Sequence, residues 1–203
     1  MSHHIDKIIY INLEKRKDRK QQIEEELNKF ELPFERFDAI STEHMGILGC
    51  TQSHLEVYKL AKQRKYKNVL ILEDDFFFLV SKKELEEELT KFFDSQFDYN
   101  VCMLSYNVTK SKEVKHYDFV RKILENQSAS GYIVNENYYD TLIALYEWAI
   151  PLLQKTGEHW NYANDQCWKS LQPKDKWFYF VKRIGKQRDG WSDNAKEYMV
   201  YDC

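Results

Sequence analysis

The segment VLILEDDFFFL, residues 69–79, places three consecutive acids inside an otherwise apolar run. The apolar residues before the acids are typical of a buried strand, so the acids come where that strand ends. Burying a carboxylate without a partner carries a large free-energy cost. A chain with this segment therefore has to fold so that something neutralises Glu73, Asp74 and Asp75.

Strand and helix patterns alternate along the rest of the chain. Strands are predicted at residues 7–13, 34–39, 68–72, 100–106, 129–134 and 177–181, and helices at 16–30, 53–65, 81–93, 135–153 and 161–171. Gly46 and Gly49 are expected to break the chain before the second helix, residues 107–113 to form a mobile loop, and the tail to be irregular. The alternation predicts an α/β fold with a mostly parallel central sheet flanked by helices. Ligands bind such sheets outside the carboxyl ends of the strands, which is where the three acids fall.

The 203 residues suit a single domain, expected to span residues 1–203 with an irregular C-terminal flap from about residue 185. The net charge of −3 argues against a nucleic-acid binder, which is usually basic. The absence of a signal peptide or an apolar run long enough to span a membrane predicts a cytoplasmic protein. No two of the four cysteines form a C-x-x-C pair, which argues against a zinc site and favours free thiols.

The three acids suggest a metal site. On an extended segment residues i and i+2 point the same way, so Glu73 and Asp75 should share a face while Asp74 points elsewhere. Two oxygen ligands side by side suit Mn²⁺ or Mg²⁺, which would neutralise a departing diphosphate. The plainer alternative is a strand end with solvated acids, because short acidic motifs recur by chance.

Four further segments accompany VLILEDD in order: YINLEKRKDR at residues 10–19, GILGCTQSHLEVYK at 46–59, SASGYIVN at 128–135 and GWSDN at 190–194. Together the five segments resemble glycosyltransferase family 25, the family of lipooligosaccharide and procollagen galactosyltransferases. SASGYIVN departs from the family's usual strand, which reads closer to G-T-x-A-Y. The resemblance implies a GT-A type fold, a UDP-sugar donor and Mn²⁺. It also implies inverting transfer of a hexose, most commonly galactose, to a hydroxyl of a glycan, lipid-linked saccharide or protein.

The same resemblance assigns site residues. Glu73 and Asp75 are the expected metal ligands. The expected donor-binding residues are Asn12, Arg16, Arg19, Ser53, His54, Asp74, Ser130, Gly131 and Asp193. Arginine suits a diphosphate because its planar fork bonds two oxygens at once, and backbone amides near a helix start bind anions. The structural alternatives are a strand-closing asparagine, a solvated helix face, a core histidine and a glycine bulge.

An inverting transfer also needs a general base that removes the proton of the acceptor hydroxyl. Asp165 lies among Trp160, Tyr162 and Trp168, and desolvation by aromatic rings raises the pKa of a carboxylate toward that of a useful base. The alternative is that Asp165 caps a helix whose aromatic residues belong to the core. Asp140 and Glu158 are weaker substitutes.

Three other functions use similar residues. A phosphoesterase or nuclease would need further acids or histidines for a second metal ion. A nucleotidyltransferase would usually carry a glycine-rich loop after the first strand, and residues 12–19 contain no glycine. A sugar-binding relative without catalysis would have a broken acidic motif, whereas LEDD is intact.

Overall fold

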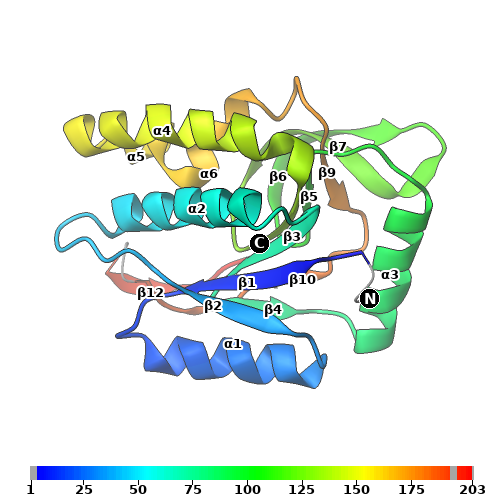
Figure 1. Cartoon of the computed structure of the whole chain (residues 1–203), viewed down its shortest axis with the longest axis horizontal. Helices are drawn as coiled ribbons and strands as arrows, with labels where there is room; N and C mark the ends of the chain where they lie inside the picture. Colours follow the sequence, from blue (N-terminus) through cyan, green and yellow to red (C-terminus); the bar gives the residue numbers. More distant parts are fainter. Residues whose placement is uncertain (1–3, 193–195, 203) are drawn as a thin grey trace.

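A mixed sheet of eight strands, in the order β2-β1-β3-β8-β5-β9-β7-β6, runs through the centre of the molecule (Figure 1). The computed structural model describes residues 4–192 and 196–202. The strands are β1 (Lys7–Asn12), β2 (Phe34–Asp38), β3 (Asn68–Glu73), β5 (Val101–Met103), β6 (Asn107–Val114), β7 (Tyr117–Gln127), β8 (Gly131–Asn135) and β9 (Trp177–Phe180). Six of the eight strands run in one direction and β7 and β8 run against them, which confirms the mostly parallel sheet.

Helices cover both faces of this sheet. Helices α2 (Gly46–Gln63) and α4 (Tyr139–Thr156) lie above it in Figure 1, whereas α1 (Lys17–Lys29) lies below and α3 (Lys82–Asp94) at one end. The side chains of β1 alternate between the two resulting cores, with Ile8 packed on the α1 and α3 side and Ile9 on the α2 and α4 side. Burial on both faces explains why the central strands are continuously apolar.

The remaining elements are short. They are η1 (Glu136–Tyr138), α5 (His159–Tyr162), α6 (Asn164–Cys167), η2 (Trp168–Ser170), β4 (Phe76–Phe78), β10 (Gly185–Gln187), β11 (Gly190–Ser192) and β12 (Glu197–Met199). Strand β10 pairs with β4, directly after the three acids, and β11 pairs with β12. The tail that was predicted to be irregular therefore contains three short strands.

Two further expectations were wrong. Residues 107–113, predicted as a loop, belong to the edge strand β6, which pairs with β7 and is itself exposed along most of its length. Exposure allows β6 to be polar at every position except Val108 and Val114, so the strand lacks the apolar alternation that marks a half-buried one. The helix predicted at 161–171 is broken at Ala163, whose backbone is extended, into α5, α6 and η2.

The second helix begins at Gly46, before the predicted start at Ser53. A Cβ atom on Gly49 would lie 2.2 Å from the carbonyl oxygen of Ile40, which no real side chain tolerates. Gly49 thus permits the loop after β2 to lie against the first turns of α2. Of the two glycines that suggested a chain break, Gly46 begins the helix and Gly49 marks a close approach of two backbones.

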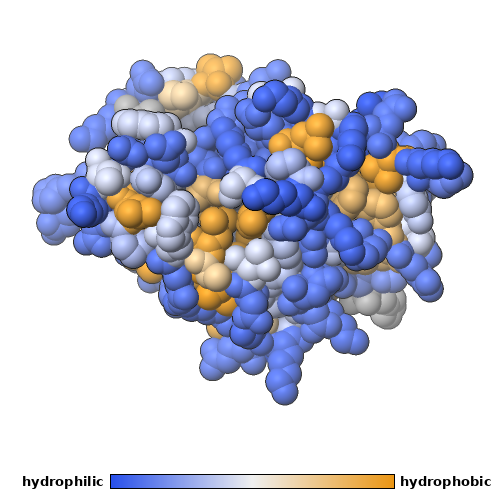
Figure 2. Space-filling model, turned by 90° about the horizontal axis from the view of Figure 1, so that it is seen from above, coloured by the Kyte–Doolittle hydropathy of each residue, from blue (hydrophilic) through white to orange (hydrophobic). Residues whose placement is uncertain are grey.

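Hydrophilic side chains cover most of the face above α4, with small apolar groups between them (Figure 2). Across residues 4–192 and 196–202, the structure has no helix long and apolar enough to cross a bilayer.

The close packing of β8 against β4 can be tested at Gly131. A Cβ atom there would lie 2.5 Å from the ring of Phe76, which is fully buried. Gly131→Ala should therefore lower the free energy of unfolding by roughly 1–3 kcal/mol, the usual cost of overpacking. Gly190→Ala is the matched control, because nothing lies within 4 Å of its Cβ position. Equal midpoints of the two variants in urea would contradict this account.

Candidate active site

The acids Glu73, Asp74 and Asp75, called here the acidic turn, are the last residue of β3 and the two residues that connect it to β4. Nη1 of Arg19 lies 3.1 Å from Oδ1 of Asp74 and 2.9 Å from Oδ2 of Asp75. The prediction that Asp74 points away from Asp75 was therefore wrong, because the extended geometry ends at Glu73. Asp74 is 8% and Asp75 5% exposed, which excludes the alternative of solvated acids.

Two other segments contact the acidic turn directly, and a third is joined to it through Arg19. Nδ2 of Asn12, at the end of β1, donates to Oδ2 of Asp74 at 2.7 Å and to the carbonyl oxygen of Arg16 at 3.1 Å. Nε2 of Gln187, in β10, donates to Oδ2 of Asp75 at 3.0 Å. Nη2 of Arg19 also donates to the carbonyl oxygen of Trp191 at 2.8 Å. Asn12 was expected to bind the UDP-sugar donor. In the structure its side chain instead holds Asp74 in position.

The acidic turn carries more negative charge than its neighbours neutralise. Burial and the negative charge of Glu73 together raise the pKa of Asp75 to about 7, although Arg19 opposes both. Burial likewise raises the pKa of Asp74. Oδ1 of Asp75 is buried and has no hydrogen-bond partner among the described residues. An oxygen site with excess negative charge and an unpartnered carboxylate atom fits a hard divalent cation.

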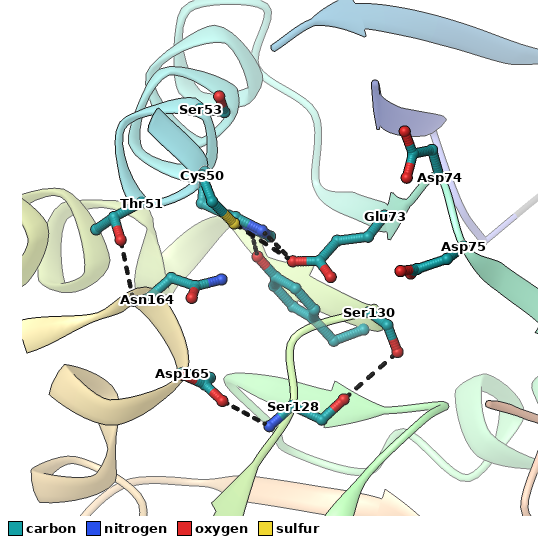
Figure 3. A network of polar contacts seen from close by, with 12 residues as sticks. Cys50, Thr51, Ser53, Glu73, Asp74, Asp75, Ser128, Ser130, Asn164 and Asp165 are labelled. Atoms are coloured by element: carbon teal, nitrogen blue, oxygen red, sulfur yellow. Dashed lines mark hydrogen bonds and ion pairs between the residues drawn. The ribbon is translucent and has the colours of Figure 1, made fainter. Parts of the chain in front are cut away.

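The side chain of Glu73 points toward Cys50 of α2 (Figure 3). Its Oε1 accepts a hydrogen bond from Nε2 of His54 at 3.0 Å and one from Sγ of Cys50 at 3.6 Å. Burial acts to raise the pKa of Glu73, but the hydrogen bond from His54 opposes it and the pKa is lowered. Glu73 is therefore held as a carboxylate by residues of α2.

A cavity of about 800 Å³ opens over the acidic turn. Arg16, Arg19 and the three acids line one part of it, and Lys15 and Lys196 add positive charge. Its volume suits a nucleotide-sized ligand. Positive side chains around buried acids would let a cation and a diphosphate bind side by side.

Sequence reasoning missed a large part of the cavity wall. The segment between β2 and α2 contributes Thr42 and Met45, and His159 and Tyr201 also line the cavity. The segment follows a strand at the ligand-binding edge of the sheet, so its position was a usable signal. His159 and Tyr201 carried no signal, because they reach the cavity only through the packing of α5 and the tail.

Several expected donor residues lie behind the cavity wall. Ser53 is fully buried, where its Oγ accepts from the backbone N of Ile40 at 2.8 Å and donates to the carbonyl oxygen of Gly49 at 2.7 Å. Ser130 is also fully buried, and its carbonyl oxygen accepts from the backbone N of Glu73 at 2.8 Å. Ser53 and Ser130 therefore hold segments behind the cavity in place, and Gly131 packs against Phe76.

Arg16 lies at the cavity, immediately before α1. Its guanidinium donates from Nε to Asp18 at 3.0 Å, and this hydrogen bond lowers the pKa of Asp18 to about 2. Asp18 thus sits in the first turn of α1 as the partner of Arg16. The expected donor residue Asp193 lies outside the described residues.

Asp165 lies on α6, and Ser128 and Ser130 come between it and the acidic turn (Figure 3). Its Oδ2 accepts from the backbone N of Ser128 at 3.1 Å. The φ of Ser128 is 79°, in the left-handed region that disfavours a side chain, and such strain is common at functional sites. Of the aromatic neighbours, Trp168 is fully buried in the core whereas Trp160 is 60% exposed.

This sheet, with acids and a cavity at the carboxyl end of β3, has the α/β architecture of the GT-A type. A glycosyltransferase involved in the glycosylation of the major capsid of PBCV-1 matches 93% of this chain and 96% of its own, with 12% identity and a TM-score of 0.53. A197 from STIV matches 97% and 94%, with 11% identity and a TM-score of 0.52. At these identities the likeness shows the fold.

The family model described as glycosyltransferase family 25 (LPS biosynthesis protein) matches residues 5–47 and 44–167. The chain belongs to this family and is a glycosyltransferase, which decides against the phosphoesterase and nucleotidyltransferase alternatives. The matched residues include four of the five motif segments, and GWSDN lies beyond them. No curated protein sequence matches the chain significantly.

The raised pKa of Asp75 makes a prediction about stability. An unfolded aspartate has a pKa near 3.8 and folded Asp75 one of about 7, so folding favours the protonated form. Stability from this group is present below pH of about 4 and is lost as the pH rises through about 7. Without divalent cations, Asp75→Asn should raise the free energy of unfolding at pH 8 by roughly 1–3 kcal/mol and change it little near pH 4.

Urea unfolding in EDTA at the two pH values measures this difference. Asp118→Asn is the control, because Asp118 is exposed and its hydrogen bond to Lys91 lowers its pKa. That variant should be slightly less stable at pH 8, the opposite sign. If Asp75→Asn is less stable than the wild type at pH 8, then the ionised carboxylate of Asp75 does not destabilise the fold, and this account is wrong.

Proposed function

We propose that the protein is a metal-dependent inverting glycosyltransferase that moves a hexose, with galactose the first to test, from a UDP-sugar to a hydroxyl. The acceptor belongs to a glycan, a lipid-linked saccharide or a protein. The observation that carries the proposal is the unpartnered Oδ1 of Asp75, held in an acidic turn within a cavity of about 800 Å³. Membership in family 25 supports the sugar chemistry.

Asp75 would hold Mn²⁺ or Mg²⁺, with Asp74 and Glu73 beside it. The oxygen-only donor set of the aspartates matches the preference of both cations. When bound, such a cation neutralises the charge that develops on a departing diphosphate. Because Glu73 is already bonded to His54 and Cys50, Asp75 is the principal ligand in this proposal.

The basic residues of the cavity have two roles. Arg19 has both Nη atoms engaged, with Nη1 on the aspartates and Nη2 on the carbonyl oxygen of Trp191, so it organises the acidic turn. Arg16, Lys15 and Lys196 line the cavity and supply positive charge for the diphosphate. In this proposal Arg16 binds the diphosphate of the UDP-sugar donor, whereas Arg19 positions the acidic turn.

Asp165 is the proposed general base. The backbone N–H of Ser128 fixes one carboxylate oxygen, and Nε2 of Gln166 lies 3.3 Å from the other. Trp160 and Trp148 expose 60% and 56% of their surface near α5 and α6, where an aromatic ring can cover a sugar face of the acceptor. His159 lines the cavity and is the competing base.

Donor hydrolysis without acceptor tests the metal-dependent chemistry. UDP release from one member of a panel of UDP-sugars should require Mn²⁺ or Mg²⁺, stop with EDTA, and fall at least about 100-fold in Asp75→Ala. Asp118→Ala is the matched control, because Asp118 is 90% exposed and pairs with Lys91. If no donor is hydrolysed and calorimetry detects no UDP binding with Mn²⁺, the proposal is wrong.

The base is tested with the best acceptor from a panel of glycosides. Asp165→Asn should lower kcat about 10²–10⁴-fold, the usual contribution of a general base, and leave UDP affinity unchanged. His159→Gln separates the two candidates under the same conditions. A large fall in His159→Gln with little change in Asp165→Asn would transfer the role to His159.

A further inference from the structure

We propose a second metal site, selective for a soft divalent cation such as Zn²⁺, formed by Cys50, His54 and Glu73. Each residue offers one ligand atom, and the three atoms lie within 4.8 Å of one another. Oε1 of Glu73 is 3.0 Å from Nε2 of His54 and 3.6 Å from Sγ of Cys50. Zinc bonds of about 2.0–2.3 Å place tetrahedral ligands at similar separations, so small side-chain shifts would close the site.

The ligand chemistry separates this site from the two aspartates. A thiolate and an imidazole favour Zn²⁺, whereas the aspartate oxygens suit Mg²⁺ or Mn²⁺. With Cys50 as thiolate and Glu73 as carboxylate, the two negative charges balance one divalent cation. His54 is fully buried, and a net charge is costly in a buried position. A metal site without net charge therefore suits this place in the fold.

Rigid elements bring the three ligands together. Cys50 and His54 are four residues apart on α2, so they share one face of the helix. Glu73 ends β3 opposite that face, and its side chain points toward Cys50 (Figure 3). The sequence argued against zinc because no two cysteines are closely spaced. The fold instead combines one cysteine with a histidine one turn later and a distant acid.

The surroundings of His54 supply the outer support that a metal-binding histidine needs. Its Nδ1 lies 2.6 Å from the hydroxyl of Tyr132, which is 2.7 Å from the hydroxyl of Tyr58. Tyr58 donates to Tyr146 at 3.3 Å, and Tyr146 donates to the carbonyl oxygen of Asn164 at 3.0 Å. Partners of this kind fix the orientation and tautomer of a ligating ring.

The proton balance is closed. On metal binding, Sγ of Cys50 releases its proton to solvent and bonds the cation as a thiolate. His54 stays neutral, and its proton moves from Nε2 to Nδ1, where it is donated to Tyr132. Tyr132 then donates to Tyr58, so every hydroxyl in the chain that ends at Asn164 keeps an acceptor. Cys50 and Glu73 line the cavity, which leaves the fourth position for water.

Cobalt spectroscopy of the full chain tests the proposal. The protein is stripped with EDTA, desalted, kept reduced with a phosphine and titrated with Co²⁺. We expect a near-ultraviolet thiolate-to-cobalt band and strong visible bands of a tetrahedral ion, all removed by Zn²⁺. Cys50→Ser should abolish the thiolate band and weaken Zn²⁺ binding at least about tenfold. Cys167→Ser is the matched control, because Sγ of Cys167 only donates to Asn164, at 3.5 Å, and serine can do the same.

The outcomes are separate from those of the proposed function. Asp75→Asn should keep the thiolate band, because Asp75 belongs to the other metal site. The proposal is overturned if the wild-type chain gives no thiolate band, if Cys50→Ser retains it, or if Asp75→Asn loses it. Circular dichroism of each variant confirms that the chain is folded. A thiolate band in a protein that neither hydrolyses nor binds a UDP-sugar would overturn the proposed function alone.

Discussion

The contact of Arg19 with Asp74 and Asp75 is the interaction on which the site depends. One guanidinium bridges two buried carboxylates at the end of β3 and bonds the carbonyl oxygen of Trp191 as well. It thereby joins α1, the acidic turn and the C-terminal tail. Because Glu73 adds a third negative charge, Arg19 alone leaves the turn under-neutralised, and the pKa of Asp75 stays raised to about 7. The folded chain thus holds a position that is costly when empty and favourable for a cation.

The acidic turn is also the meeting point of two polar systems. On one side the aspartates face a cavity with basic walls. On the other, Glu73 begins a buried chain of contacts through His54 and three tyrosines to the carbonyl oxygen of Asn164, the residue before Asp165. This chain runs from Glu73 to the backbone of the residue next to the candidate base. A fully bonded polar network of this kind keeps functional groups in fixed relative positions.

Much of the fold was predictable because its central strands are buried on both faces and its helices are amphipathic. The helix predicted at residues 81–93 is α3, and it begins at a capping box in which Oγ of Ser81 accepts from the backbone N of Glu84 at 3.3 Å. The failures have equally physical causes. Strand β6 is polar because it lies at an exposed edge, and Gly49 lies inside a helix because a neighbouring backbone needs the space. Neither cause is visible from local sequence.

The sequence by itself determined that three acids end a buried strand at the ligand-binding edge of an α/β sheet, and the motif order indicated the family. Local spacing suffices for this, because strand burial and chain order are properties of neighbouring residues. The tertiary structure decided which side chains meet. It set Asp74 beside Asp75, turned Asn12, Ser53 and Ser130 into supports, and brought Cys50 and His54 to Glu73. These partners come from different elements, and only packing fixes the distances between them.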